Sequence, residues 1–400
     1  MKTNNNIPAY RFQGYTDAWE LRKLGECSTL ITKGTTPRDK SGIGVVNFVK
    51  VENLVNGDII PLQKIQLEEH EGYLKRSQLI ENDILFSIAG TLGRTAIVKK
   101  SILPANTNQA LSIIRGYEFD RNFLVTILRG VVVREFIKRN PTIGAQPNLS
   151  LEQVSNLCLL TPCSEEQSAI GTFFSTLDQH ITLHQRKLDT LKEQKKTYLK
   201  LLFPAKGQTK PALRFQGFED DWKEMKLGEV LVEYNKKSEI ENQFELLSST
   251  NSGIEPRSGR VSGESNIGYK IIKRGMVVLS PQNLWLGNIN YNAKFEIGIV
   301  SPSYKVFNIY GPNELFLATV LRLPQMFFEY AQASVQGASI VRRNLDLDLF
   351  GSILVQLPSL PEQEFIGTFF QTLDQEIAQV EDKLASLKEM KKTLLRKLFV

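Results

Sequence analysis

Residues 170–179 read IGTFFSTLDQ, and residues 366–375 read IGTFFQTLDQ, so the two stretches agree in all but one letter. The likeness extends through the sequences that follow, to LKLLFP in the first copy and LRKLFV in the second. A second repeated block opens each half of the chain, RFQGYTDAWELRKLGE from Arg11 and RFQGFEDDWKEMKLGE from Arg214. The chain of 400 residues is therefore two copies of one plan, and this duplication decides the architecture.

The repeated stretches open two long helices. Apolar residues recur there at alternating steps of four and three, which is the 3.5-residue period of a coiled-coil seam. The predicted seam consists of Ile170, Phe174, Leu177, Ile181, Leu188 and Leu191 in the first copy, and of Ile366, Phe370, Leu373, Ile377, Leu384 and Leu387 in the second. A helix of about 38 residues is roughly 57 Å long. An apolar stripe of this length needs a partner, and the duplication favours antiparallel pairing of the two helices with each other.

Two details of these helices concern polar residues, and the first allows two interpretations. Lys195 and Lys391 occupy equivalent positions in the seam. Either their stems lie along the groove with the ammonium groups in solvent, or their charges fix the register or contact a partner. At the start of the first helix, Ser164 and Gln167 have the spacing of a capping box.

The regions between the repeated segments share little sequence but have a similar texture. Each shows short β-like runs separated by turn signals, followed by a helical stretch. We predict an α+β fold: two pseudo-repeated mixed α/β domains, each followed by a long α-helix, with the two helices paired as an antiparallel coiled coil. The predicted segments are a first domain at 1–163, a helix at 164–203, a linker at 204–213, a second domain at 214–358 and a helix at 359–400.

The composition is that of a globular protein, with 42% hydrophobic and 23% charged residues. No apolar run approaches the ~18–20 residues of a membrane span, and the start, MKTNNNIPAY, lacks the apolar core of a signal peptide. We therefore expect a cytoplasmic protein. The net charge of +6 and the pI near 9.0 are compatible with a nucleic-acid partner but do not require one.

Polar residues in glycine-containing loops point to DNA. Such side chains reach base edges, while Lys, Arg and backbone N–H groups hold phosphates. Candidates in the first domain are Lys33, Thr35, Thr36, Arg38, Arg94, Asn106, Asn108, Gln109, Gln146 and Asn148. Candidates in the second are Arg257, Arg260, Gln282, Asn283, Trp285, Arg342, Arg343 and Asn344. Any one of them is equally well interpreted as a solvated loop residue, but the set favours nucleic acid.

No catalytic constellation is apparent. The chain lacks a phosphate loop, a dinucleotide-binding fingerprint, H-E-x-x-H and G-x-S-x-G. Asp346 and Asp348 have no neighbouring residues that would complete a metal centre, and we expect them to be strand or turn residues. His180 and His184 have the spacing of two helical zinc ligands, but without a third ligand we expect exposed histidines. We predict no catalytic residue and no metal site.

The duplicated plan, the two RFQG openings, the EEQSAIGTFF and PEQEFIGTFF helix starts and the LKEQKK and LKEMKK helix bodies together resemble the specificity (S) subunit of type I restriction–modification enzymes. The resemblance covers essentially the whole chain. It implies that each variable region is a target recognition domain for one half of a split double-stranded DNA sequence. It also implies that the long helices act as a spacer and as a docking surface for methyltransferase (M) subunits.

The resemblance further implies the partners. Two M subunits would join this chain, and added restriction (R) subunits would make the complex an adenine DNA methyltransferase and ATP-dependent endonuclease that defends against foreign DNA. S-adenosylmethionine, ATP and magnesium would belong to the partner subunits and no cofactor to this chain. Because the two domains differ, we expect a bipartite, asymmetric target.

Three other interpretations suit the same sequence. The chain could be a free-standing DNA-binding protein, a coiled-coil scaffold whose domains bind proteins, or the specificity chain of a related split-site system in which methyltransferase and nuclease are fused.

Overall fold

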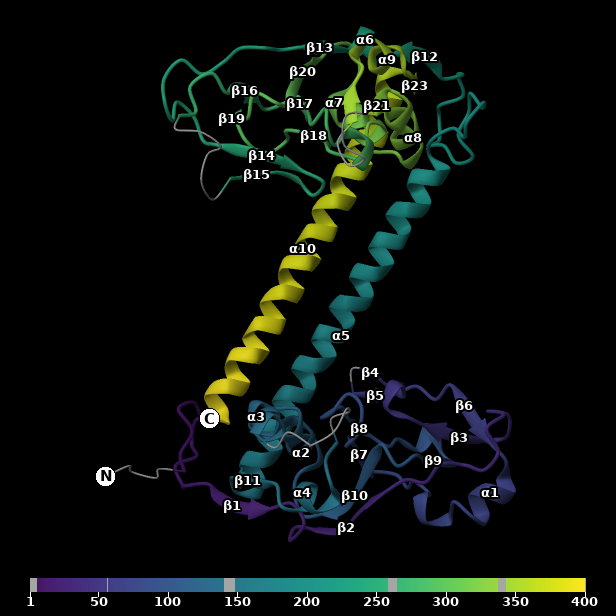
Figure 1. Cartoon of the computed structure of the whole chain (residues 1–400), viewed down its shortest axis with the longest axis vertical. Coiled ribbons are helices and arrows are strands. Elements are labelled where there is room, and N and C mark those ends of the chain that lie inside the picture. Colours follow the sequence, from purple (N-terminus) through teal and green to yellow (C-terminus); the bar gives the residue numbers. More distant parts are fainter. Residues whose placement is uncertain (1–5, 56, 140–147, 258–264, 337–342, 400) are drawn as a thin grey trace. The chain divides into compact units, whose positions relative to one another are not determined.

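The computed structural model describes residues 6–55, 57–139, 148–257, 265–336 and 343–399. The chain divides into two compact units (Figure 1). The first unit comprises Met1–Lys187 and Glu381–Val400, and the second comprises Leu188–Val380. Each unit therefore contains one variable region and part of each long helix. The prediction treats each domain and each helix as a separate continuous segment. The two compact units instead meet within the long helices, between residues 187 and 188 and between residues 380 and 381.

The first variable region is built from short elements. Its strands are β1 (Glu20–Lys23), β2 (Ser28–Lys33), β3 (Val46–Val49), β4 (Leu54–Val55), β5 (Asp58–Ile59), β6 (Gln63–Ile65), β7 (Ile84–Ser87), β8 (Thr95–Ile97), β9 (Ala105–Thr107), β10 (Leu111–Tyr117) and β11 (Cys158–Thr161). Its helices are α1 (Leu67–Glu71), α2 (Arg121–Leu128), α3 (Val131–Arg139) and α4 (Leu151–Ser155), with 3-10 turns η1 (Val51–Asn53), η2 (Lys75–Ser77) and η3 (Lys100–Ile102). The long helix α5 (Ser164–Leu201) follows.

The second variable region has a comparable inventory. Its strands are β12 (Lys223–Lys226), β13 (Leu231–Glu233), β14 (Leu247–Thr250), β15 (Gly253–Pro256), β16 (Lys270–Lys273), β17 (Val277–Leu279), β18 (Ile289–Tyr291), β19 (Ile297–Val300), β20 (Lys305–Ile309), β21 (Ser334–Gln336), β22 (Arg343–Leu345) and β23 (Leu354–Leu357). Its helices are α6 (Leu227–Val230), α7 (Glu314–Val320), α8 (Pro324–Gln332) and α9 (Leu347–Ser352), with the 3-10 turn η4 (Leu284–Leu286). The long helix α10 (Leu360–Leu398) follows.

Each unit has its own four-stranded central sheet, and the two sheets have the same topology. The strand order is β2-β10-β7-β8 in the first unit and β13-β20-β17-β18 in the second, and every neighbouring pair is antiparallel. A two-stranded sheet also recurs, β1-β11 and β12-β23, which joins the opening block to the strand just before the long helix. The remaining sheets differ in extent: the first unit has the three-stranded sheet β6-β3-β9, whereas in the second unit β14 pairs with β15, and Leu246, just before β14, is joined to β19 only by an isolated parallel bridge with Ile299. The predicted fold class is confirmed, and the variation between the copies lies around a common scaffold.

The RFQG block is tied to the start of the long helix by a buried ion pair. Arg11 donates from Nε and Nη2 to the two carboxylate oxygens of Glu166, at 2.8 and 2.7 Å. Arg214 donates in the same way to the two carboxylate oxygens of Glu362, with both distances 2.7 Å. Both carboxylates are shielded from solvent and lie in the first turn of a helix, where the helix dipole also favours negative charge. Within each copy, the RFQG block therefore supplies the arginine of this ion pair, and the repeated helix start supplies the glutamate.

The glycine of each repeated IGTFF stretch permits a close helix crossing. A Cβ atom on Gly171 would lie 2.4 Å from Oδ1 of Asp120, the residue that caps α2. Gly367 meets the start of α7 in the same manner. The Gln167 side chain completes the junction by accepting from the backbone N of Asp120 at 3.0 Å and donating to the carbonyl O of Pro162. The predicted capping box with Ser164 does not describe this end, since α5 begins at Ser164 itself.

The ends of the two helices complete the cores. In the first unit, the ring of Phe399 from the end of α10 lies 5.9 Å from Trp19 and 6.5 Å from Phe174 at the start of α5. In the second unit, Phe203, just beyond the end of α5, takes the equivalent place against the Trp222 and Phe370 rings, at 5.9 Å from each. In both units the end of one helix therefore lies beside the start of the other, which is the predicted antiparallel pairing.

Opposite charges reinforce this pairing in both units. All predicted seam residues are buried except Ile181, which is half-buried. Beside the seam, Lys391 donates to Asp178 in the first unit, and Lys195 donates to Asp374 in the second. Equivalent residues thus form reciprocal pairs, because the helices are antiparallel. The two seam lysines are not merely solvated: each has a carboxylate partner on the facing helix.

Reversing the charge of Lys195 tests this pairing. Lys195→Asp places two carboxylates together, and we expect a lower urea midpoint, by about 1 kcal/mol of unfolding free energy. The exchange Lys195→Asp with Asp374→Lys should restore the midpoint. The same exchange at Lys391 and Asp178 should restore less, because Arg129 Nη1 also lies 3.7 Å from Asp178.

Lys392→Asp serves as the control for these variants. Lys392 is exposed and its ion pair is with Glu389 on its own helix. A midpoint of Lys195→Asp equal to that of this control would show that the reciprocal pairs do not contribute to helix pairing.

Candidate nucleic-acid interface

Most of the predicted DNA-contacting loops of the first unit leave its central sheet at one end. The register pairs Lys33, the last residue of β2, with Ser112, and Ser87, the last residue of β7, with Leu111, the first of β10. Because the strands are antiparallel, the connections around these residues emerge together. These connections are the segments 34–40, 88–94 and 108–110.

Gly34 brings two of these segments into contact. A Cβ atom on Gly34 would lie 2.0 Å from the carbonyl O of Thr107, so only glycine fits. The next residues use this approach: the Thr35 backbone N donates to Thr107 O at 2.9 Å, and the Thr36 hydroxyl donates to the side-chain oxygen of Gln109. Two predicted motifs that are distant in the sequence therefore form one surface, with Thr36 and Gln109 exposed on it.

Arg38 lies over an aromatic ring at the border of this surface. Its guanidinium carbon is 4.3 Å from the centroid of the Tyr73 ring, while its backbone N donates to Glu69. Arg76 joins the same surface, because its Nε donates to the Thr35 hydroxyl at 3.3 Å. Tyr73 and Arg76 were missed by the sequence analysis. The stretch YLKR at 73–76, an aromatic residue followed closely by two cations, is the signal that indicates them.

Arg94 and Asn148 lie near the connection that follows β7. The backbone N of Arg94 donates to the Ser87 hydroxyl at 2.7 Å, and its exposed guanidinium reaches the carbonyl O of Val51. Asn148 forms an isolated bridge with Ala89 and is exposed. Gln146 lies outside the described residues. Lys33 is exposed at the end of β2, and Asn108 is half-buried, with its side chain accepting from the backbone N of Ala110.

Asn106 does not belong to this surface. It is completely buried, its Nδ2 donates to the carbonyl O of Leu74 and to the Ser77 hydroxyl, and its Oδ1 lies 2.5 Å from Nδ1 of His70. Both ends of the amide are engaged inside the protein. The prediction of Asn106 as a base-contacting residue is therefore corrected: it holds η2 and α1 against β9.

In the second unit the connection between β17 and β18 occupies the position of the 88–94 segment. It contains exposed Gln282, half-buried Asn283 and half-buried Trp285. The Arg343 guanidinium carbon lies 4.7 Å from the centroid of the Trp285 ring, so β22 lies against this connection. The Trp285 Nε1–H has no hydrogen-bond partner among the described residues, and Asn344 beside Arg343 is exposed.

The hairpin β14-β15 lies beside β18, the strand that follows this connection. The Asn290 side chain donates to the carbonyl O of Thr250 and accepts from Arg322, whose other nitrogen donates to the carbonyl O of Asn251. The turn of β14-β15 is thereby fixed beside β18. Arg257 lies at the opposite end of that hairpin, where its backbone N donates to Leu246, so it does not join the Trp285 surface. Arg260 and Arg342 lie outside the described residues.

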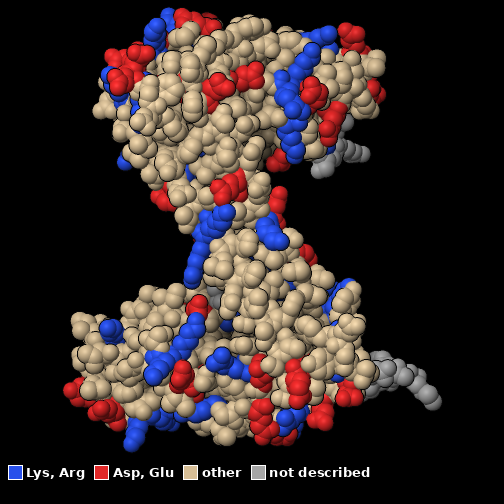
Figure 2. Space-filling model, turned by 180° about the vertical axis from the view of Figure 1, so that it is seen from behind, with Lys and Arg blue, Asp and Glu red and all other residues tan. Residues whose placement is uncertain are grey.

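Charges of both signs occur on the face of each unit that Figure 2 shows, where Lys and Arg side chains lie among Asp and Glu. The guanidinium–aromatic pairs, Arg38 with Tyr73 and Arg343 with Trp285, distinguish the two surfaces more clearly.

Residues 16–193 match the family model described as the type I restriction modification DNA specificity domain. This segment of the chain is similar to that domain. The match ends within α5, but the second half of the chain repeats both the sequence blocks and the central sheet of the first.

Two further proteins are similar to this chain over nearly its whole length. The chain is 23% identical to the putative type I restriction enzyme MjaX specificity subunit of Methanocaldococcus jannaschii, over 94% of this chain and 92% of that protein. The crystal structure of the type I restriction–modification system S subunit from M. genitalium has a TM-score of 0.64 to this chain at 18% identity, covering 98% and 99% of the two chains. The likeness to that crystal structure shows that the fold is shared.

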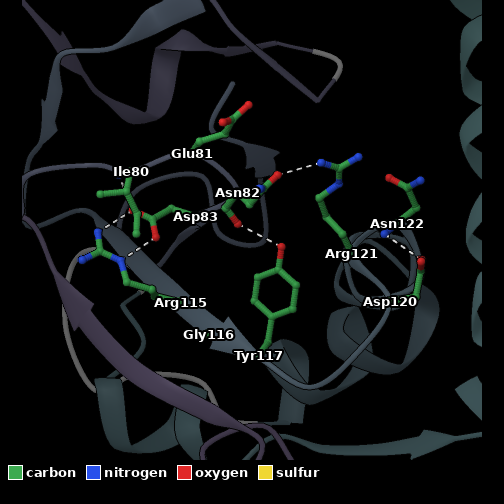
Figure 3. A pocket seen from close by; sticks show the side chains of 10 residues that line it. All are labelled: Ile80, Glu81, Asn82, Asp83, Arg115, Gly116, Tyr117, Asp120, Arg121 and Asn122. Carbon is green, nitrogen blue, oxygen red and sulfur yellow. Dashed lines mark hydrogen bonds and ion pairs between the residues drawn. The ribbon is translucent and has the colours of Figure 1, made fainter. Parts of the chain in front are cut away.

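A polar pocket lies at the opposite end of the central sheet of the first unit (Figure 3). It has a volume of about 550 Å³. The Tyr117 hydroxyl donates to the carbonyl O of Asn82 at 2.9 Å, and Arg121 donates to the Asn82 side chain at 2.7 Å. Burial raises the pKa of Tyr117 to about 12, so the hydroxyl stays a donor at neutral pH. Arg115 is paired with Asp83. These contacts hold the segment that precedes β7 against β10 and α2, and we therefore interpret the pocket as structural.

The remaining sequence predictions concern metals and membranes. In the described part of the chain, no group of three or more His, Cys, Asp or Glu side chains is placed to hold a metal ion. Asp346 caps α9 by accepting from the backbone N atoms of Asp348 and Leu349, and His184 Nδ1 bonds to the carbonyl O of His180. Among the described helices, none combines the length and apolarity needed to cross a membrane.

The different roles of Asn106 and Gln109 can be measured. Asn106→Ala leaves buried polar groups without partners, and we expect a loss of about 1–3 kcal/mol in the free energy of unfolding. Gln109→Ala removes an exposed side chain and should leave the unfolding midpoint within error of the unmodified chain. An unchanged midpoint for Asn106→Ala in urea or thermal unfolding would contradict the structural role.

Proposed function

We propose that this chain reads a bipartite, asymmetric DNA target and directs the methyltransferase and restriction subunits of a type I enzyme to it. The observation that carries the proposal is the duplicated sheet, β2-β10-β7-β8 and β13-β20-β17-β18, whose connections at one end differ in chemistry. A common scaffold with two different recognition surfaces suits a target with two different halves.

The first surface is suited to DNA by hydrogen bonding and charge. Thr36 and Gln109 present a hydroxyl and an amide, which can bond to base edges in a groove. Arg38 and Arg76 border them and can contact phosphates. Because Gly34 fixes the distance between the two loops, these groups are held in place before DNA arrives.

The second surface offers a different combination. Arg343 over the Trp285 ring presents a guanidinium whose plane is supported by an aromatic side chain, and Gln282 and Asn344 are exposed nearby along the chain. An arginine held in this way suits the bidentate contact to guanine. The first surface also has a guanidinium over an aromatic ring, Arg38 over Tyr73, but it presents the Thr36 hydroxyl and the Gln109 amide beside it, so the two half-sites are expected to differ in sequence.

The chemistry of modification and cleavage belongs to the partners in this proposal. Two M subunits would bind S-adenosylmethionine and methylate adenine, and R subunits would use ATP and magnesium for cleavage. The support is the family relationship, together with the absence of recognised catalytic motifs from the sequence. The paired helices would set the separation of the two half-sites.

Substitutions in one domain should relax one half-site only. In the assembled methyltransferase, Arg343→Ala should reduce discrimination at one or two positions of the second half-site by roughly ten- to a hundredfold, because a bidentate contact contributes about 1–3 kcal/mol. Thr36→Ala with Gln109→Ala should relax the first half-site. Methylation-aware sequencing of plasmid libraries with either half-site randomised measures both effects.

The control for these substitutions is Lys200→Ala, an exposed lysine near the end of α5, which should leave both half-sites unchanged. Relaxation of both halves by Arg343→Ala would contradict modular reading. If the unmodified chain with its M subunit methylates no gapped motif, the proposed function itself is wrong.

A further inference from the structure

A lysine of the second unit is buried among charged neighbours. Lys270, the first residue of β16, has a side chain that is only 8% exposed. Its Nζ lies 3.6 Å from Oε1 of Glu233, the last residue of β13. Lys305, the first residue of β20, donates to the same oxygen at 2.8 Å. Two ammonium groups therefore share one carboxylate, and the nearer ammonium belongs to Lys305, not to the buried Lys270.

A third cation adds to this excess of positive charge. Lys237 forms an isolated bridge with Lys270, so the segment after β13 lies along β16. Burial lowers the pKa of Lys270, and the ammonium of Lys305 lowers it further. Glu233 opposes these effects, and Lys237 adds a smaller lowering. The charged form of Lys270 is therefore less stable here than in water, although a carboxylate is close by.

The scaffold that the two units share does not require this cluster. The last residue of β17 pairs with Lys305, and the last residue of β7 pairs with Leu111, so these two positions correspond. By the same register, Glu233 corresponds to Thr32. The first unit thus forms the same sheet without these charges. Because a buried ammonium group costs free energy unless it is fully paired, sheet formation does not account for Lys270.

The cluster lies at the end of the sheet that carries the candidate DNA-contacting connection. Lys305 pairs with Leu279, the last residue of β17, and the connection that contains Gln282 begins directly after it. Since the strands are antiparallel, the end of β13, the start of β20 and the end of β17 lie together. A duplex that meets the Gln282 connection therefore also meets this edge of the sheet.

We propose that Lys305, Lys270 and Lys237 hold one phosphate group of the DNA backbone beside the second half-site, and that Glu233 keeps the ammonium groups in place in the free protein. The inference rests on the proposed function, in which this domain reads DNA. Its new content is a backbone-binding site in the second unit that the corresponding positions of the first unit lack. Such a site fixes the position of the duplex without distinguishing one base from another.

A phosphodiester suits the cluster by charge and by hydrogen bonding. Glu233 balances one of the three ammonium groups, which leaves positive charge for a further anion. Each ammonium has three N–H donors, more in total than one carboxylate accepts. The unesterified oxygens of a phosphate accept the remaining bonds, which are charge-assisted. The negative charge would also raise the pKa of Lys270 toward its ordinary value.

The first experiment measures binding of the assembled methyltransferase to a duplex with its gapped motif at a series of salt concentrations. Each phosphate contact adds about 0.9 to the slope of log affinity against log salt concentration. Lys305→Met should therefore reduce the slope by about one unit and weaken binding roughly tenfold at about 0.1 M salt. The loss should be equal for the matched duplex and for a duplex with one substituted base pair.

The second experiment locates the phosphate. Methylphosphonate, which carries no charge, replaces the phosphates one at a time on both strands around the second half-site. With the unmodified chain, substitution at one or two adjacent positions should weaken binding as much as Lys305→Met does. In the Lys305→Met variant the same substitutions should have no further effect, whereas those at other positions should keep theirs.

Glu233→Gln should change binding in the opposite direction. It removes the balancing carboxylate, and we expect about fivefold tighter binding to every sequence, a gain that misfolding cannot produce. The control is Lys294→Met. Lys294 is exposed and follows β18 at the opposite end of the sheet, so its substitution should change neither the salt slope nor the affinity.

Inorganic phosphate is a second source of the same chemistry. It is added to the full chain without DNA, at constant ionic strength, and the melting temperature is measured. A rise in melting temperature that Lys305→Met abolishes, together with an unchanged DNA salt slope in that variant, would assign the cluster to a free anion and overturn the proposal.

The outcomes separate this site from the proposed function. If the unmodified complex prefers no gapped motif, the proposed function fails. If it binds its motif and Lys305→Met leaves the salt slope unchanged, or Glu233→Gln does not tighten binding, the phosphate site is overturned while the proposed function stands. Relaxed base discrimination in Lys305→Met would also overturn it, because the lysine would then contact a base.

Discussion

The structure depends on the packing of one aromatic ring at the end of each long helix. Phe399 fills the core of the first unit against Trp19 and Phe174, and Phe203 fills that of the second against Trp222 and Phe370. Full burial of such a ring contributes about 1.5–3 kcal/mol. Each variable domain is therefore completed by a helix that begins outside its own sequence segment. Each domain core is complete only when the end of the other copy's helix has packed into it.

The repeated decapeptide acts at this junction. Its isoleucine and second phenylalanine enter the core, its glycine admits the start of α2 or α7, and its aspartate pairs with a lysine of the facing helix. One sequence serves both copies because the surroundings of the two helix starts are equivalent. Selection for DNA recognition can then act on the connections at the far end of each sheet without disturbing the junction.

The helices, their seam and their antiparallel pairing could be predicted from the sequence. An apolar period of 3.5 residues and an internal duplication are both patterns that can be recognised in the sequence itself. The contact between Arg11 and Glu166 could not, since a bond between residues far apart has no local signature. The same limit applies to Gln167, whose spacing from Ser164 suggested a local cap, while its amide bonds to the cap of another helix.

The candidate DNA surface was predicted in part for a related reason. Residue type alone does not distinguish Asn106 from Gln109. The Asn106 side chain is buried and bonds to three residues, whereas Gln109, three residues later, is exposed. Tyr73 and Arg76 are more than 30 residues from Thr35 and Arg38 in the sequence, and only the fold brings the two pairs together. Lys195 and Lys391 were placed correctly in the seam, but their carboxylate partners became clear only when the facing helix was in place.

The division of the first unit between the two ends of the chain has a consequence for synthesis. Its contributing segments are Met1–Lys187 and Glu381–Val400, whereas the second unit is continuous. On the ribosome, the second domain can close while the first still exposes Trp19, Phe123 and Phe174 to solvent. The first domain becomes native only when the last helical turns have left the exit tunnel, and until then its open core is a surface for chaperones and proteases. A premature stop codon in the final turns would thus disable a domain encoded at the beginning of the gene.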